Sequence, residues 1–142
     1  MKHPPLTLSR TAALKKEGGQ AMTELALVMP IFALLILAIV QFGIAFNNYL
    51  TLTDATRAGA RKAAVSRFVG DDGASAKLAV ENAAAGLDPA KLDPNITVTS
   101  TPDWTTTGSQ VAVTASYPYS INIFGFVVKA GNLTSTTKES LE

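Results

Sequence analysis

The chain has 142 residues, of which 47% are hydrophobic and 16% are charged, and its formal net charge is +1. Soluble domains carry about 25% charged residues, so this composition argues against a disordered tail and an ordinary soluble enzyme. The near-neutral charge gives no support to nucleic acid as a partner. The sequence has no cysteine and one histidine, His3, which excludes a disulfide framework and a thiolate metal site. We therefore expect no catalytic residues, no metal ligands and no cofactor.

A basic segment opens the chain. Four basic residues between Lys2 and Lys16 stand against one acid, Glu17. Basic residues beside a membrane span favour the cytoplasmic side, although four more follow the span between 57 and 67. The pair at positions 15 and 16 lies closer to the span, so we expect a cytoplasmic N-terminus and an exported C-terminal part.

The stretch from Leu25 to Phe46 is apolar apart from Gln41. As a helix it would be roughly 33 Å long, enough for a hydrocarbon core of about 30 Å. The alternative is a buried helix of a soluble protein, which is disfavoured because the remaining chain is too short to surround it. Pro30 removes one backbone donor, so we expect a kink or a local opening there.

The junction before this stretch holds small residues and one carboxylate. Gly18 and Gly19 precede the apolar run, whereas the cleavage site of a secretory signal peptide follows it. Cleavage after Gly19 would remove the basic segment and leave a mature chain that begins at Gln20. Glu24 lies beside the apolar run, where a carboxylate is costly unless it is hydrated, protonated or paired. Taken alone, it could also be a first-turn residue favoured by the helix dipole.

Together these features resemble a class III prepilin signal. The run GGQAMTELALVMPIFALLILAIVQFGIAF is similar to the start of the TadE-like family, the pseudopilins or minor pilins of tight-adherence (Tad/Flp), type IVb-like pili. The likeness continues through TLTDATRAGARKAAV and covers Gly18 to about Phe68. Leu25 departs from the Phe or Tyr that this family carries after the Glu, and brings the chain nearer to type IV pilin and type II secretion pseudopilin leaders.

The resemblance implies processing and assembly. A prepilin peptidase would cut between Gly19 and Gln20, and Glu24, Leu25 and Pro30 would serve recognition and assembly. The protein would cross the bacterial inner membrane once, with its C-terminal domain in the periplasm, and become pilus-associated after processing. The implied partners are the peptidase, other pilin or pseudopilin subunits, the inner-membrane pilus platform and membrane lipid.

Helical composition continues beyond the span. Ala55, Gly59 and Ala63 recur every four residues and so line one helix face, where small side chains allow another backbone or sheet to approach closely. We interpret the neighbouring basic residues as a solvated face rather than a contact with lipid or another subunit. The sequence GDDG at 70–73 predicts a turn and lacks the spaced oxygen ligands of a calcium loop.

A short helix and a small sheet are predicted next. The helix covers Ser75 to Ala85 and is stopped by the prolines and the glycine that follow, Gly86, Pro89 and Pro94. Alternating apolar and polar residues predict three strands. These lie at Ile96–Thr99, at Val111–Tyr117, where Pro118 ends the strand, and at Leu133–Lys138. We expect the sheet to be antiparallel, with one face on the small-residue face of the long helix.

The apolar run from Ile121 to Val128 is ambiguous. It could be a strand, a plug under the sheet, or a surface that touches membrane or a partner. Core packing is the default interpretation, whereas an exposed patch of this size would mark an interface.

The expected fold class is therefore α+β, a long transmembrane helix that continues into a small pilin-like domain. We expect a leader over 1–19, a transmembrane and assembly helix over 20–46, and an exported domain over 47–142. The expected function is that of a minor pilin or pseudopilin of a Tad pilus. The alternatives are a type II secretion pseudopilin and an uncleaved bitopic membrane protein with a small binding domain. An enzyme is the least favoured class.

Overall fold

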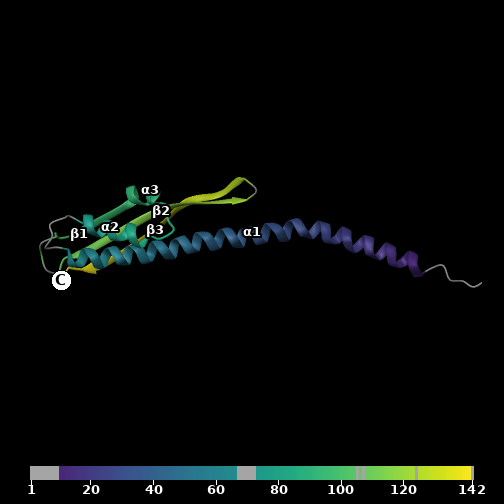
Figure 1. The fold of residues 1–142 in the computed structure, drawn as a ribbon, viewed down its shortest axis with the longest axis horizontal. Helices are drawn as coiled ribbons and strands as arrows, with labels where there is room; N and C mark the ends of the chain where they lie inside the picture. The colour runs from purple at the N-terminus through teal and green to yellow at the C-terminus, as the bar shows by residue number, and fades with distance from the viewer. Residues whose placement is uncertain (1–9, 67–72, 105, 107, 124, 142) are drawn as a thin grey trace, which may run out of the picture. The chain divides into compact units, whose positions relative to one another are not determined.

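The computed structural model describes residues 10–66, 73–104, 106, 108–123 and 125–141, with side chains described from Gly19 onward. The elements (Figure 1) are α1 (Arg10–Val65), α2 (Ala74–Ala83), α3 (Pro89–Leu92), the 3-10 turn η1 (Asp93–Asn95), β1 (Ile96–Thr101), β2 (Gln110–Ile123) and β3 (Phe126–Ser140). The predicted α+β class is confirmed. Residues 1–9 of the expected leader and residues 70–72 of the expected turn lie outside the described residues.

The chain divides between Val40 and Gln41 into two units. The first contributes the N-terminal part of α1, in which every residue from Gly19 to Val40 is exposed. This helix is long and apolar enough to cross a membrane. It is continuous through Pro30, so the missing backbone donor does not end the helix.

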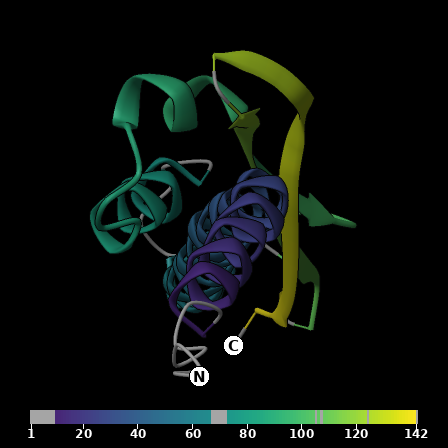
Figure 2. The same cartoon turned by 90° about the vertical axis from the view of Figure 1, so that its right-hand side faces the viewer.

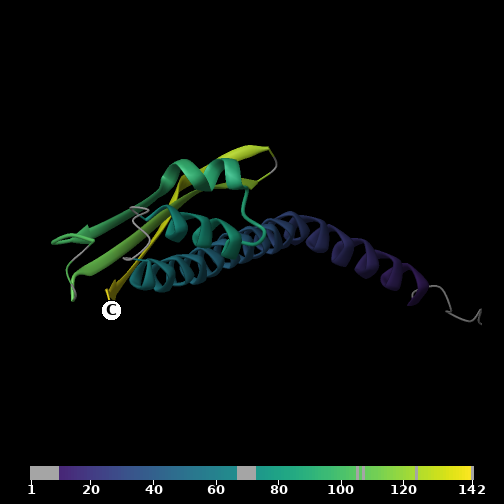
Figure 3. The same cartoon turned by 60° about the vertical axis from the view of Figure 1, so that its left-hand side comes forward.

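The second unit contains the sheet, whose strands are antiparallel in the order β1-β2-β3. The strands cover the predicted segments and extend beyond them. On β2, Val111, Val113 and Ala115 are fully buried, while the residues between them point to the other face, as the period of two in a strand requires. The chain reaches this sheet from α2 through α3 and η1 (Figure 3).

The core lies between the sheet, α2 and the C-terminal part of α1. In Figure 2, α2 and β3 flank α1. Small side chains dominate the buried face of α1, and the two residues of α2 that reach the core are Ala76 and Val80. Large side chains close the ends of the core, with Leu92 and Leu141 almost completely buried. Packing of many small residues therefore lets the helices and the sheet approach closely.

The prediction that Pro118 ends the second strand is wrong, because β2 continues to Ile123. Proline cannot donate a hydrogen bond to a sheet, so it is confined to strand edges. β1 pairs with β2 only as far as Ala115. Beyond this point, β2 pairs with β3 alone among the strands that the structure describes. Pro118 therefore lies where β2 has one free edge.

The default interpretation of the run at 121–128 is also wrong. The run forms the end of the β2–β3 hairpin, and Phe126, Val127 and Val128 are exposed by 77%, 62% and 63%. The hairpin extends past β1, so this part of the sheet lacks the neighbours that would bury both of its faces. The core takes its apolar residues from the other end of β2 instead.

The segment after α2 also differs from the prediction, which treats Pro89 as a residue that stops a helix. Pro89 begins α3, and the side chain of Asp88 caps this helix by accepting a hydrogen bond from the Ala90 N–H at 3.1 Å. Proline suits the first helical position because its missing donor is unsatisfied there in any case. The helix α2 itself ends at Ala83.

Candidate functional site

The junction residues lie on an open surface of α1. The side chain of Gln20 donates a hydrogen bond from Nε2 to Oε1 of Glu24 at 3.1 Å, and the hydroxyl of Thr23 donates to the carbonyl oxygen of Gly19 at 2.7 Å. A Cβ atom added at Gly19 would meet nothing within 4 Å. The peptide bond between Gly19 and Gln20 is therefore accessible to another protein.

The helix brings Gln20 and Glu24 together, since residues four apart lie on the same helix face. If the chain were cut after Gly19, the new α-amino group would belong to a residue whose side chain already contacts this carboxylate. The structure does not bring Leu25 or Pro30 into that contact. Both are exposed on the apolar part of α1, where they are available to lipid or to another helix.

The small-residue face of α1 is occupied by the chain itself. Ala55, Gly59 and Ala63 are all buried. A Cβ atom at Gly59 would overlap Cγ2 of Val80 and would lie 3.1 Å from the carbonyl oxygen of Ala76, both on α2. This face therefore packs α1 against α2 and the sheet in the second unit.

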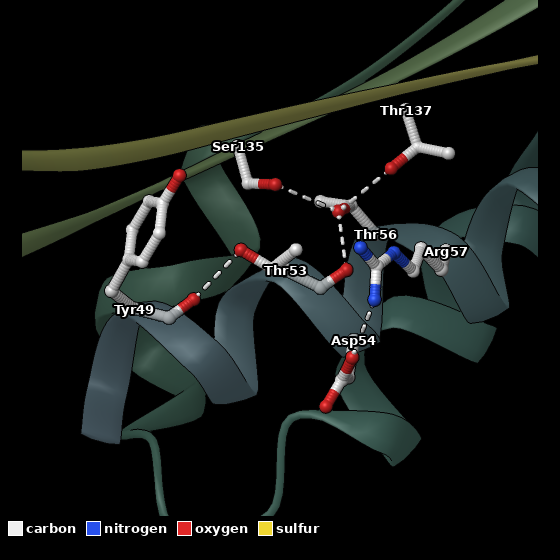
Figure 4. Close-up of polar contacts among 7 residues, drawn as sticks. All are labelled: Tyr49, Thr53, Asp54, Thr56, Arg57, Ser135 and Thr137. Atoms are coloured by element: carbon white, nitrogen blue, oxygen red, sulfur yellow. Dashed lines mark hydrogen bonds and ion pairs between the residues drawn. The ribbon is translucent and has the colours of Figure 1, made fainter. Parts of the chain in front are cut away.

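A buried threonine that the sequence analysis missed joins α1 to β3 (Figure 4). The hydroxyl of Thr56 lies 3.0 Å from the hydroxyl of Ser135 and 3.2 Å from that of Thr137, and it donates to the carbonyl oxygen of Thr53 at 2.9 Å. Thr56 is completely buried and Ser135 is 8% exposed. Single threonines within a helix give no periodic signal, so only the alternation of hydroxyl residues on the third strand could have indicated this contact.

A charged cluster connects α2 to η1. Nζ of Lys77 lies 2.6 Å from Oδ1 of Asp93. The hydrogen bond with Lys77 lowers the pKa of Asp93, and the same bond raises the pKa of Lys77. Glu81 shares a hydrogen bond with Asp93, which raises the pKa of Glu81. The attraction between Lys77 and Asp93 therefore connects α2 to η1. When Glu81 and Asp93 are both ionised, their two carboxylates repel each other and weaken this connection.

In the part of the chain that the structure describes, no group of three or more His, Cys, Asp or Glu side chains could hold a metal ion. The polar contacts described above are hydrogen bonds and ion pairs that position elements. The surfaces of α1 that are open to other molecules include the junction at 19–25 and the exposed apolar residues that follow it.

The comparisons with known proteins bear on the same part of the chain. No curated protein and no solved structure matches the sequence. Residues 19–61 match the model of the family described as TadE-like protein. The matched range begins at the residue of the expected cleavage site and ends within the small-residue face of α1. Residues 19–61 are therefore a TadE-like segment, and the resemblance predicted from the sequence is confirmed for this part of the chain.

Proposed function

We propose that the protein is a minor pilin or pseudopilin of a Tad-type pilus, inserted in the inner membrane, cut after Gly19 and assembled through α1. The observation that carries the proposal is the combination of a TadE-like segment at 19–61 with a helix whose apolar residues from Leu25 to Val40 are all exposed. Burial of apolar surface is the main driving force for association. Lipid would bury this surface before assembly, and the helices of neighbouring subunits would bury it afterwards.

The open junction supports the processing step of this proposal. Gly19 and Gln20 are exposed on the helix surface, and the absence of a side chain at Gly19 leaves room for a peptidase. After cleavage, the carboxylate of Glu24 would lie beside the new α-amino group at Gln20. Opposite charges that enter a medium of low dielectric constant need such a partner, so this pair would allow the helices to bundle.

Intact-mass measurement tests the processing step. The full chain is expressed in membranes with and without an active prepilin peptidase, and we expect the loss of residues 1–19 only with the peptidase. Gly19→Val should block cleavage. Gly43→Val is the matched control, because Gly43 is also a helical glycine at which a Cβ atom would meet nothing within 4 Å. A chain that keeps its N-terminus beside an active peptidase would instead support an uncleaved bitopic protein.

The machinery is tested separately. Processed protein should co-purify with filaments or with the pilus platform in a host that carries a Tad system. If it supports type II secretion in a complementation assay and does not associate with Tad filaments, the type II pseudopilin alternative replaces the proposal.

A further inference from the structure

The end of the β2–β3 hairpin carries an apolar surface that pilus assembly through α1 does not use. We call Phe126, Val127 and Val128 the tip patch; all three are more than 60% exposed. The next residue along the chain is Lys129, also exposed. Successive strand residues point to opposite faces, so these three side chains cover both faces of the hairpin at its end. Exposed apolar surface at such a position marks a site of interaction.

Two hydrogen-bonded contacts and a cavity between them define the course of the hairpin along α1 within the second unit. The hydroxyl of Thr56 contacts Ser135, far from the tip. Nearer the tip, a cavity of about 230 Å³ separates α1 from the hairpin. Nearest the tip, Nε2 of Gln41 donates a hydrogen bond to the carbonyl oxygen of Asn122 at 3.1 Å. The hairpin therefore follows α1 back from Thr56 to Gln41, toward the apolar stretch.

The cavity is lined mainly by apolar side chains, and the residues of α1 that precede Gln41 are apolar as well. Four of its lining residues belong to α1 and three to the hairpin: Phe42, Ala45, Phe46, Tyr49, Tyr119, Ile121 and Leu133. The rings of Phe42 and Phe46 are stacked, with centroids 6.3 Å apart. The apolar surface of α1 thus continues onto the hairpin without a charged residue between them.

The position of Gln41 gives the level of the tip relative to a bilayer. Gln41 lies five residues before the end of the apolar stretch at Phe46, which corresponds to roughly 8 Å along a helix. If the stretch crosses the membrane, the backbone at Asn122 lies at or below the headgroup boundary. Amphipathic segments that lie in this boundary bury their apolar face by about 5–10 Å.

We propose that the tip patch inserts into the lipid beside α1, at the membrane surface where α1 emerges into the exported domain. Phe126, Val127 and Val128 contact acyl chains, and Lys129 extends its ammonium group toward the headgroups, as long basic side chains do at interfaces. This gives the unassembled subunit a second membrane contact, which restricts rotation of the exported domain about the helix axis. The inference rests on the membrane-spanning helix of the proposed function.

Lipid quenching tests the inference in the full chain reconstituted into phosphatidylcholine and phosphatidylglycerol vesicles. The sequence has no cysteine, so a Val127→Cys variant takes a single environment-sensitive fluorophore. Val65→Cys is the matched control, since Val65 is also a valine and is 59% exposed. Phe42→Cys reports on the span itself. We expect brominated acyl chains to cause a loss of fluorescence at positions 42 and 127 and none at position 65.

Each other outcome overturns the inference in a distinguishable way. Quenching at 42 with no quenching at 127 refutes tip insertion and leaves the span intact. No quenching at either position removes the span and the inference together. A third outcome is a label at 127 that brominated lipid does not quench and that is shielded from aqueous iodide only at a high protein-to-lipid ratio. This outcome assigns the patch to contact with a second copy of the chain.

Discussion

At the scale of single residues, Gly59 is a point of close contact between α1 and α2. Its position leaves no room for a methyl group, because Val80 and the backbone of Ala76 occupy that space. Val80 is β-branched and completely buried, so its side chain cannot rotate away at low cost. Sequence periodicity predicts the small-residue face, but it does not say whether the chain itself or another subunit fills it.

We predict that Gly59→Ala destabilises the second unit. Overpacking costs about 1–3 kcal/mol, and the better helix propensity of alanine returns about 1 kcal/mol. The net loss is then up to about 2 kcal/mol, and relative to a glycine replaced without overpacking it is about 1–3 kcal/mol, as measured by thermal unfolding followed by circular dichroism in detergent. The control is Gly43→Ala, where the added methyl group meets nothing within 4 Å. Equal stability of the two variants would contradict the packing described at Gly59.

Thr56 supplies the polar counterpart of this packing. Thr56→Val keeps the shape of the side chain but removes the hydroxyl that Ser135 and Thr137 contact. Leaving a buried hydroxyl unsatisfied costs about 1–3 kcal/mol, so the free energy of unfolding should fall by this amount in a denaturant titration. Thr114→Val is the control, since its hydroxyl bonds Thr136 on the exposed face at 2.9 Å and should change stability by less than about 0.5 kcal/mol.

At the scale of elements, sequence patterns located the helices and strands well where one face is buried. Alternation identified Val111–Tyr117 because the core removes every second residue from water. It did not identify the outer part of β3, where every residue from Phe126 to Asn132 is exposed and alternation has no physical cause. The helix α3 was missed although Asp88-Pro89 is a helix-start signal, an N-cap residue followed by proline at the first helical position. Its four residues are too few to show a helical period.

The ion pair between α2 and η1 should make the domain sensitive to acid. A lowered pKa of Asp93 means that its contribution to stability is present above its ordinary pKa of 3.8 and is lost as the pH falls through the lower, folded value. Lys77→Gln should therefore lower the melting temperature slightly at neutral pH and lose this effect under strong acid. Lys91→Gln removes an equal charge from the 3.5 Å pair with Asp88 and serves as the control. If the melting temperatures of Lys77→Gln and the parent chain differ by the same amount under strong acid, the effect does not come from the ion pair between Lys77 and Asp93.

At the scale of the whole molecule, the two units present different surfaces to their surroundings. The second unit has a core of its own and no cysteine, so packing and hydrogen bonds stabilise it. The helix from Gly19 to Val40 exposes every residue, so it depends on other molecules. A junction can be predicted from sequence alone because its chemistry is local: a glycine, a carboxylate four residues after Gln20, and an apolar run. How copies of the chain pack against one another depends on whole surfaces, so no short sequence pattern predicts it.

Glu24 is predicted to act at this scale. Glu24→Ala removes the carboxylate that contacts Gln20, and we expect processed subunits that remain in the membrane fraction and fail to enter filaments. Sheared filaments and membranes are compared by immunoblot with the parent chain. Thr23→Val is a suitable control, because it removes a neighbouring hydrogen bond and keeps the carboxylate. Normal assembly of Glu24→Ala would remove the proposed charge pair.

The single tryptophan makes the folded state of the second unit visible to spectroscopy. Trp104 is half-buried against the core, and a Cβ atom at Gly73, just before α2, would lie 3.2 Å from its ring. Its fluorescence therefore reports on the contact between the loop after β1 and the start of α2. Emission should shift to longer wavelength on unfolding, and an unchanged spectrum in denaturant would contradict this burial. One intrinsic probe thus follows the folding of this unit in the purified protein without an added label.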